Sequence, residues 1–247
     1  FLNTVRSNKG SALVYILIAI ALLAALTVTF MEPSSQQTSS QNTFKTVSSV
    51  KRQADFIQSA LQECILSFSD GDNEIDTSES GTDPGARTNY PIAPNSEYYD
   101  GSEDGQYNNR FVRNLRCPGD KLEPEPTNEH QKMFGGGGGK FLPPAPDFFS
   151  EWKYYNGTDG VYYWIETDKS DAFLTTALKR IDDNFSECEA DVINATGGAI
   201  DLDSGSPAQT QCPNNSLCLR VWLISNRSTA VYPGQEEIEA ECSQTDS

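Results

Sequence analysis

The feature that most restricts how this chain can fold is an uninterrupted apolar run near its N-terminus. Residues 11–31, SALVYILIAIALLAALTVTFM, contain no charged residue, no glycine and no proline. At about 1.5 Å of rise per residue, a helix over this run covers about 31 Å, which matches the ~30 Å hydrocarbon thickness of a bilayer. The run therefore predicts one helix that is long enough to cross a membrane.

The charges on either side of this run predict its orientation. A basic leader, residues 1–10, contains Arg6 and Lys9, and no acidic residue occurs before Glu32. Basic flanks stay on the cytoplasmic side, so we expect the chain after the run to be exported. A secretory signal peptide is the alternative, but its apolar region usually has only about 7 to 15 residues and ends in a small-residue cleavage site. Here Glu32-Pro33 follows instead.

The junction between the leader and the apolar run resembles the class III leader of type IV pilins. Lys9-Gly10 meets the run without a spacer, and a dedicated peptidase of that family cuts after such a glycine. The resemblance implies cleavage between Gly10 and Ser11, with processing before Phe1 as the alternative, because mature pilins commonly begin with Phe. It also implies that the mature subunit polymerises by burying this helix among copies of itself. The implied filament-core residues are Leu13, Val14, Tyr15, Ile16, Leu17, Ile18, Ile20, Leu22, Leu23 and Leu26.

One position departs from the pattern of that family. Most type IV pilins have Glu as the fifth residue after the cut, where this chain has Tyr15. In the family, that carboxylate is thought to pair with the N-terminal amine of a neighbouring subunit. Its absence resembles the exceptions, chiefly the minor pilins that initiate a filament at its tip. A minor pilin or pseudopilin is therefore the first alternative to a major subunit.

Beyond the apolar run, residues 32–68 are predicted to continue the helix or to form a linker followed by an amphipathic helix. The polar stretch 33–43 has no apolar period, so it is either a flexible joint or a weakly held part of one long helix. Apolar residues then recur at spacings of three and four, which is the period of one helical face that we expect to pack against the head. These residues are Phe44, Val47, Val50, Ala54, Ile57, Leu61, Ile65 and Phe68.

Residues 69–247 are predicted to form one exported, acidic, loop-rich head. Aromatic and β-branched residues predict strands at 160–167 and 217–225, and 228–232 is a candidate hairpin partner of the second strand. Apolar spacing predicts a helix within 171–188. The expected fold class is therefore α+β, with a long N-terminal hydrophobic and amphipathic helix followed by a loop-rich head that contains an antiparallel sheet.

Six cysteines all follow the apolar run, and an even number in a loop-rich exported domain predicts three disulfides. Many pairings are formally open. A structural zinc site or c-type haem is disfavoured, because the chain has no Cys-x-x-Cys and its single histidine is His130. The favoured pairs are Cys212 with Cys218, Cys64 with Cys117, and Cys188 with Cys242.

Charge and histidine content exclude two classes of function. The chain has 35 acidic and 18 basic residues, a net charge of -17, so the head repels phosphates and we expect no nucleic acid binding. His130 lies in an acidic, proline-rich stretch where nothing predicts burial or a positioned nucleophile. We therefore expect neither a Ser-His-Asp nor a Cys-His apparatus, and the chain is not predicted to be an enzyme.

Two short acidic loops are candidates for calcium, and no other cofactor is expected. One loop contains Asp70, Asp72 and Asp76, and the other contains Asp201 and Asp203. Alternating carboxylates on a glycine-containing turn can gather the oxygen ligands that Ca²⁺ prefers, although a solvated acidic turn is the commoner outcome.

An aromatic cluster precedes the first predicted strand. Either it forms a sugar-binding face or, as we favour, it is a core or subunit contact. Its members are Phe148, Phe149, Trp152, Tyr154 and Tyr155.

These features together predict a structural subunit of an extracellular filament that resembles a type IV pilus or fimbria. Its expected partners are copies of itself in a helical homopolymer, the inner membrane before assembly, and the pilus assembly machinery. The alternatives are a minor pilin or pseudopilin at a filament tip, or a membrane-tethered exported binding protein, such as an adhesin or lectin, that does not polymerise.

Overall fold

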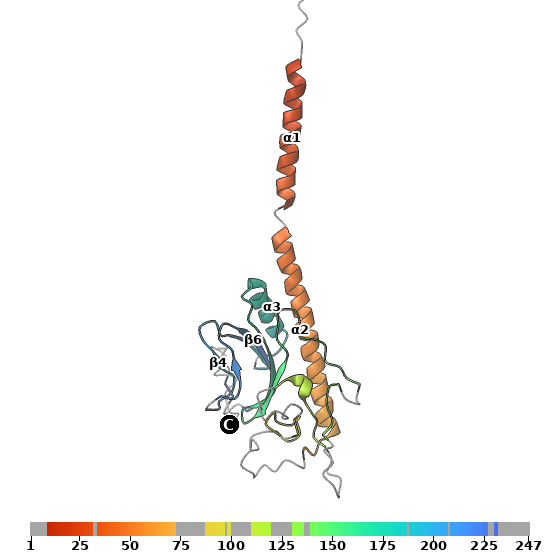
Figure 1. The fold of residues 1–247 in the computed structure, drawn as a ribbon, viewed down its shortest axis with the longest axis vertical. Helices are drawn as coiled ribbons and strands as arrows, with labels where there is room; N and C mark the ends of the chain where they lie inside the picture. Colours follow the sequence, from red (N-terminus) through yellow and green to blue (C-terminus); the bar gives the residue numbers. More distant parts are fainter. Residues whose placement is uncertain are drawn as a thin grey trace, which may run out of the picture. The chain divides into compact units, whose positions relative to one another are not determined.

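The computed structural model describes residues 9–31, 34–72, 87–96, 98–99, 110–119, 130–135, 139–186, 188–206, 208–226 and 230–231. The chain forms two compact units, Phe1–Asn42 and Thr43–Ser247. The expected α+β class with an antiparallel sheet is confirmed for the described residues (Figure 1).

Helix α1, Lys9–Met31, contains the apolar run. Every side chain from residue 13 to 27 is exposed. The predicted membrane crossing is not supported, because no helix among the described residues is both long enough and apolar enough to span a bilayer.

Helix α2, Ser34–Ser67, includes the polar stretch that the sequence left open as either joint or helix. From residue 43 onwards one face of α2 is buried, and Val50, Ala54, Ile57 and Leu61 have no exposed surface. The predicted packing of this stripe is therefore confirmed, with one correction at its start. Phe44 is 74% exposed, because Thr43 and Thr46 occupy the inward-facing positions of that turn.

A four-stranded antiparallel sheet forms the centre of the second unit, in the order β1-β2-β6-β3. Strands β2, Gly160–Thr167, and β6, Leu217–Ser225, have the predicted bounds. Strands β1, Lys153–Gly157, and β3, Ala190–Asn194, were not predicted. Strand β6 pairs with β2 and β3, and the proposed hairpin partner 228–232 lies mostly outside the described residues.

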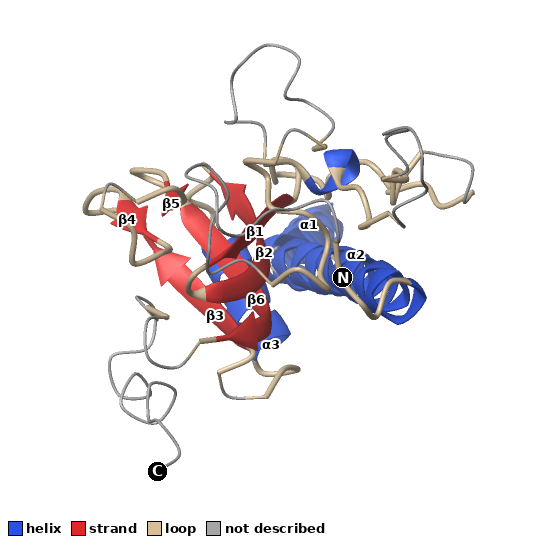
Figure 2. Cartoon of the chain, turned by 90° about the horizontal axis from the view of Figure 1, so that it is seen from below, coloured by secondary structure: helices blue, strands red, loops and turns tan. Residues whose placement is uncertain are grey.

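The two faces of the sheet carry different layers. The part of α2 after residue 42 lies on one face, and the short ladder of β4, Ile200–Asp201, and β5, Gln211–Cys212, lies on the other (Figure 2). Helix α3, Ala172–Asp182, packs on the same face as α2, and a 3-10 turn, η2, spans Val112–Asn114.

Side chains of β2 alternate between these two layers, as the pleat of a strand requires. Val161, Tyr163 and Ile165 join the core under α2, and Tyr163 Oη donates to the carbonyl of Ala54 at 3.1 Å. Tyr162 and Trp164 point into the second core. Because both faces of the sheet are covered, β2 is buried along almost its whole length.

Two of the favoured disulfides are confirmed. Cys64 on α2 is bonded to Cys117, and Cys212 on β5 is bonded to Cys218 on β6. Cys188 is also disulfide-bonded, and its predicted partner lies outside the described residues.

The aromatic cluster is mainly a core contact, as favoured. Phe149, Trp152, Tyr154 and Tyr155 are at most 9% exposed, which leaves no open aromatic face for a sugar. Phe148 differs, because 47% of its surface is exposed.

Candidate functional site

The most extensive exposed apolar surface among the described residues belongs to α1. Ten of its large hydrophobic side chains, the same ten that the sequence predicted for a filament core, are between 50% and 69% exposed. Residues 13–18 are six consecutive large apolar residues, which is more than one full helical turn. The apolar surface therefore continues around the whole helix, so a partner on one side alone would leave part of it uncovered.

The size of this surface makes exposure to water unfavourable. Burial of one large apolar side chain stabilises by roughly 1.5–3 kcal/mol, and a contiguous exposed patch of this kind is typical of a binding surface. Small residues at Ala19, Ala21, Ala24 and Ala25 allow another helix to approach α1 closely. Helix α1 is therefore the candidate assembly site.

A second candidate is the single histidine, and here the sequence-based expectation was wrong. His130 is only 2% exposed, its Nε2 lies 2.8 Å from Oδ2 of Asp72, and its ring stacks on Tyr98 with centroids 4.2 Å apart. This burial could not be predicted from the residues around His130, because Asp72 and Tyr98 come from distant segments. The contact joins the segment that follows α2 to the loop that contains His130.

Neither predicted calcium loop forms a metal centre among the described residues. Asp72 contacts His130, Asp70 is exposed, and Asp76 lies outside the described residues. No group of three or more His, Cys, Asp or Glu residues that could hold a metal ion occurs within the described ranges. Calcium binding stays an untested prediction.

Asp203 organises its own loop through hydrogen bonds. Its Oδ1 accepts from the amides of Gly205 at 2.9 Å and Gln209 at 3.1 Å. Its Oδ2 accepts from the amide of Thr210 at 2.5 Å and from the Thr210 hydroxyl at 2.7 Å. Asp201, by contrast, is exposed and accepts from the side chain of Gln211 at 2.6 Å. The two carboxylates predicted as joint ligands therefore have different roles.

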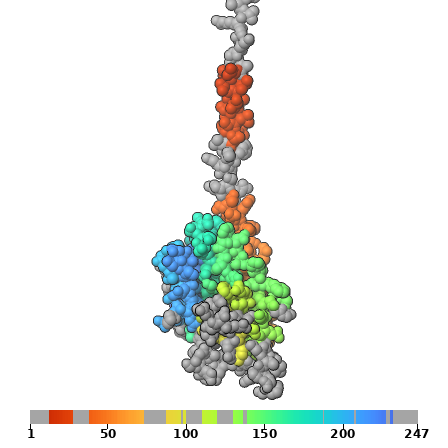
Figure 3. Space-filling view, in the orientation of Figure 1, coloured from red at the N-terminus to blue at the C-terminus, as the bar shows by residue number. Residues whose placement is uncertain are grey.

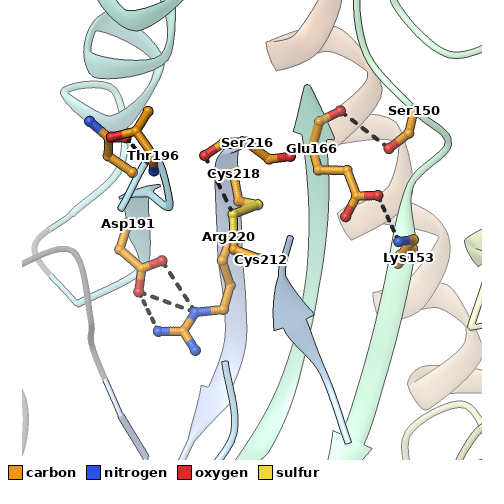
Figure 4. Close-up of a disulfide and its surroundings, with 10 residues drawn as sticks. Ser150, Lys153, Glu166, Asp191, Thr196, Cys212, Ser216, Cys218 and Arg220 are labelled. Carbon is orange, nitrogen blue, oxygen red and sulfur yellow. Dashed lines mark hydrogen bonds and ion pairs between the residues drawn. A yellow bond between two sulfur atoms is a disulfide. The ribbon is translucent and has the colours of Figure 1, made fainter. Parts of the chain in front are cut away.

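A buried ion pair lies on the face of the sheet away from α2. Arg220 on β6 donates from Nε to both carboxylate oxygens of Asp191 on β3, at 3.2 and 3.1 Å, and from Nη2 to Oδ2 at 2.5 Å (Figure 4). Its Nη1 donates to the carbonyl of Leu202 and its Nη2 to that of Val231, both at 2.6 Å. Both charged side chains are fully buried, so Arg220 connects two strands and two loops in the interior.

Aromatic rings and a disulfide enclose this ion pair. The guanidinium carbon lies 4.5 Å from the ring centroid of Trp222 and 5.1 Å from that of Tyr162. Burial raises the pKa of the Tyr162 phenol well above its ordinary value, and the nearby Arg220 opposes this only in part. The Cys212–Cys218 bridge lies beside the pair (Figure 4). An ion pair whose guanidinium already donates to a carboxylate and two carbonyls, and which lies among buried rings, is suited to stabilising the fold and not to binding a ligand.

The ionised form of one carboxyl group near this pair is unfavourable. Burial raises the pKa of Asp182, at the end of α3, to about 6, and repulsion by Asp191 and Asp183 adds to the effect. One sequence signal could have indicated the ion pair. Arg220 interrupts the mostly apolar strand LCLRVWLIS, and a charge buried in a sheet requires a partner.

No family model, no curated protein and no solved structure matches this chain. Its function is therefore inferred from its own residues.

Proposed function

We propose that this chain is a structural subunit of an extracellular filament of the type IV pilus kind, and that it polymerises through α1. The observation that supports this most is the ring of exposed apolar side chains on α1. A helix that is apolar on every side has two stable surroundings, lipid or a bundle of other helices. In this proposal the apolar surface of α1 becomes covered by neighbouring copies of the helix as the filament grows.

The junction at the start of α1 supports the same proposal. A peptidase that cuts between Gly10 and Ser11 would remove the basic leader and leave the apolar helix at the start of the mature subunit. The assembly machinery would then add the processed subunit to the filament. The order of basic leader, apolar run and large following domain suits this route.

The second unit has the properties of an exported filament coat. Its described cysteines are disulfide-bonded, which suits an oxidising compartment outside the cytoplasm. The net charge of -17 would keep a fibre that displays many copies soluble. This proposal requires no catalytic chemistry of any residue.

One observation favours a narrower role. Tyr15 stands where most of the resembled family has a glutamate, and its side chain is 69% exposed. A subunit that need not pair with the amine of a preceding subunit can occupy the tip, so a minor pilin or pseudopilin is the second candidate. A membrane-tethered adhesin or lectin that never polymerises is the rival from a different class.

Electron microscopy of material sheared from the source cells, with N-terminal sequencing of the same band, tests the proposal. We expect regular fibres whose main protein begins at Ser11 or Phe1. The variant Ile18→Glu, which places a charge in the apolar surface of α1, should abolish the fibres. Asn214→Glu, which adds the same charge to an exposed loop of the second unit, should leave them intact.

Other results would contradict this proposal. If the chain is recovered intact in membranes and is absent from fibres, the tethered binding protein becomes the better account. If both glutamate variants form fibres as the wild type does, α1 is not the assembly surface. A fibre in which this chain occurs only at the end would support the minor pilin.

A further inference from the structure

Residues 139–149, which we call the strap, lie along α2 in the opposite direction. Three polar contacts join the two segments. As the residue number rises along the strap, the residue number of the contact on α2 falls. The contacts are Lys140 Nζ to Glu63 Oε1 at 2.5 Å, Gln53 Nε2 to Pro144 O at 2.7 Å, and Lys45 Nζ to Asp147 Oδ2 at 2.6 Å. Between Lys45 and Glu63 the strap accompanies α2 for about 27 Å. In Figure 3 the orange residues of α2 border the green part of the chain to which the strap belongs.

The strap is extended because of its prolines. Pro143, Pro144 and Pro146 fix φ near the extended range and cannot continue a helix. A segment of this kind loses little further conformational entropy on binding, which suits a docking surface.

The strap and α2 carry all the exposed large hydrophobic side chains found among the described residues of the second unit. Phe44 is 74%, Leu66 82%, Phe141 72% and Phe148 47% exposed. Phe141 follows Lys140, which contacts Glu63, and Leu66 lies about one turn beyond that glutamate. Phe148 follows Asp147, which contacts Lys45, the neighbour of Phe44. Each end of the strap therefore carries an exposed phenylalanine, and the ring of Phe148 also packs edge-on against Phe173, with centroids 5.5 Å apart.

A hollow of about 190 Å³ lies between these two ends. Leu142, Pro143 and Pro144 of the strap form one wall, Trp152 forms another, and the ion pair of Arg113 with Glu151 lies at its border. An apolar cavity of about 150 Å³ can hold a benzene molecule, so this hollow can accept one phenyl ring. The same surface thus presents exposed phenyl rings and a recess of matching size.

The charge of this surface differs from that of the whole chain. Residues 43–67 and the strap contain four basic and three acidic residues, whereas the chain has 18 basic and 35 acidic residues. Two strongly acidic copies of the chain repel each other. This repulsion is weakest at a surface where basic and acidic residues are nearly equal in number. A second copy of this chain is therefore the partner that this balance best suits.

We propose that the strap and the adjoining exposed side of α2 form a docking surface for a second copy, with a phenylalanine ring of one copy seated in the hollow of the next. This rests on the proposed filament, because it describes a contact between the second units of assembled subunits. The proposed arrangement is the heterologous one, in which the ring of each copy enters the hollow of the next copy, because a heterologous contact that does not close repeats along a filament. Buried aromatic anchors in pockets dominate the energy of such contacts.

Photo-cross-linking of the full-length chain tests this docking. Benzoylphenylalanine replaces Phe141 in one sample and Phe148 in another, and assembled fibres of mixed isotope-labelled and unlabelled chains are irradiated. We expect a covalent product of twice the subunit mass from at least one sample. Its cross-linked peptides should join a labelled to an unlabelled chain, at residues 142–145 or 151–152.

A double variant gives an independent measurement. In Leu66→Ser/Phe141→Ser the fibre yield should fall by about tenfold or more, because two apolar side chains leave the contact. Its thermal unfolding temperature should stay close to that of the wild type, since both side chains are exposed in the single subunit. The matched control Asn214→Ser changes an exposed loop residue and should leave the yield unchanged.

The outcomes separate this inference from the proposed function. If wild-type fibres form, but cross-links are absent or lead only to lipid or to another protein, this docking surface is overturned and the filament stands. A normal fibre yield from the double variant overturns it as well. If the wild type forms neither fibres nor cross-linked pairs, the proposed function and this inference fail together.

Discussion

The buried ion pair of Arg220 and Asp191 gives the sharpest test of the fold. In Arg220→Met the replacement keeps most of the packing volume but leaves the Asp191 carboxylate buried without its cation. Removal of one partner of a buried pair costs about 3–5 kcal/mol. The carbonyls of Leu202 and Val231 also lose their donors, at about 1 kcal/mol each. We expect a loss of about 5–7 kcal/mol, a large part of the roughly 5–15 kcal/mol that stabilises a typical domain.

A double-mutant cycle isolates the contribution of the charges. Asp191→Leu alone leaves Arg220 buried without its anion and should also destabilise strongly. Arg220→Met/Asp191→Leu removes both charges, so it should be more stable than either single variant. Urea unfolding of the purified full-length chain in mild detergent, followed by tryptophan fluorescence, measures these differences, since Trp222 lies against the guanidinium. Arg180→Met is the matched control, because Arg180 is exposed and its loss should change stability by less than about 0.5 kcal/mol.

Two results would refute this reasoning. One is an Arg220→Met variant within about 1 kcal/mol of the wild type, which would mean that water or another group compensates Asp191. The other is a double variant as unstable as the sum of the two single variants, which would mean that the charges do not act as a pair.

Two further predictions concern pH and disulfides. The pKa of Asp182 is higher in the folded chain than in the unfolded one. Protonation of Asp182 therefore stabilises the folded state fully below about pH 4, and this stabilisation is lost as the pH rises through about 6. Asp182→Asn should raise the unfolding free energy at pH 7 by about 1 kcal/mol, a value reduced because Asp182 is partly exposed. In urea unfolding at pH 4 and pH 7, the stability of this variant should depend less on pH than that of the wild type. Serine replacement of the Cys64–Cys117 pair, 53 residues apart, should cost about 4 kcal/mol, against about 2 for Cys212–Cys218, 6 residues apart. The reverse order in thermal or urea unfolding would contradict the loop-entropy argument.

Secondary structure was predictable where one segment carried a long local signal in its own residues. Strands β2 and β6 have eight and nine residues rich in aromatic and β-branched side chains, and both were found with their exact bounds. Strands β1 and β3 have five residues each and were missed. In β1, the residues Tyr154 and Tyr155 were interpreted only as part of an aromatic cluster. Such short strands are stabilised mainly by pairing with β2 and β6, which a local pattern does not reveal.

The calcium loops show why a local cluster is a weak guide to a site. Asp70, Asp72 and Asp76 alternate in sequence, but the structure turns Asp72 inward to His130, 58 residues away. Asp203 accepts four hydrogen bonds from its own loop. Sequence spacing shows which carboxylates are close along the chain, whereas hydrogen-bond donors from elsewhere decide what each one contacts.

The sequence by itself determined the features that depend on neighbouring residues. The helix over 11–31 follows from the length of its apolar run, the buried stripe of α2 from its apolar spacing, and the two long strands from their aromatic and β-branched residues. The sequence predicted that the cysteines form disulfides but left their pairing open, and the structure confirms two of the favoured pairs.

Only the tertiary structure decided which distant residues meet. Arg220 reaches Asp191 across 29 residues, and the strap reaches α2 across about 80 to 100 residues. Such contacts form because whole faces of helices and strands must be buried together, and the polar groups carried inside then pair with whatever donors and acceptors the packing brings to them. The period of a segment records which face is buried but not which partner covers it.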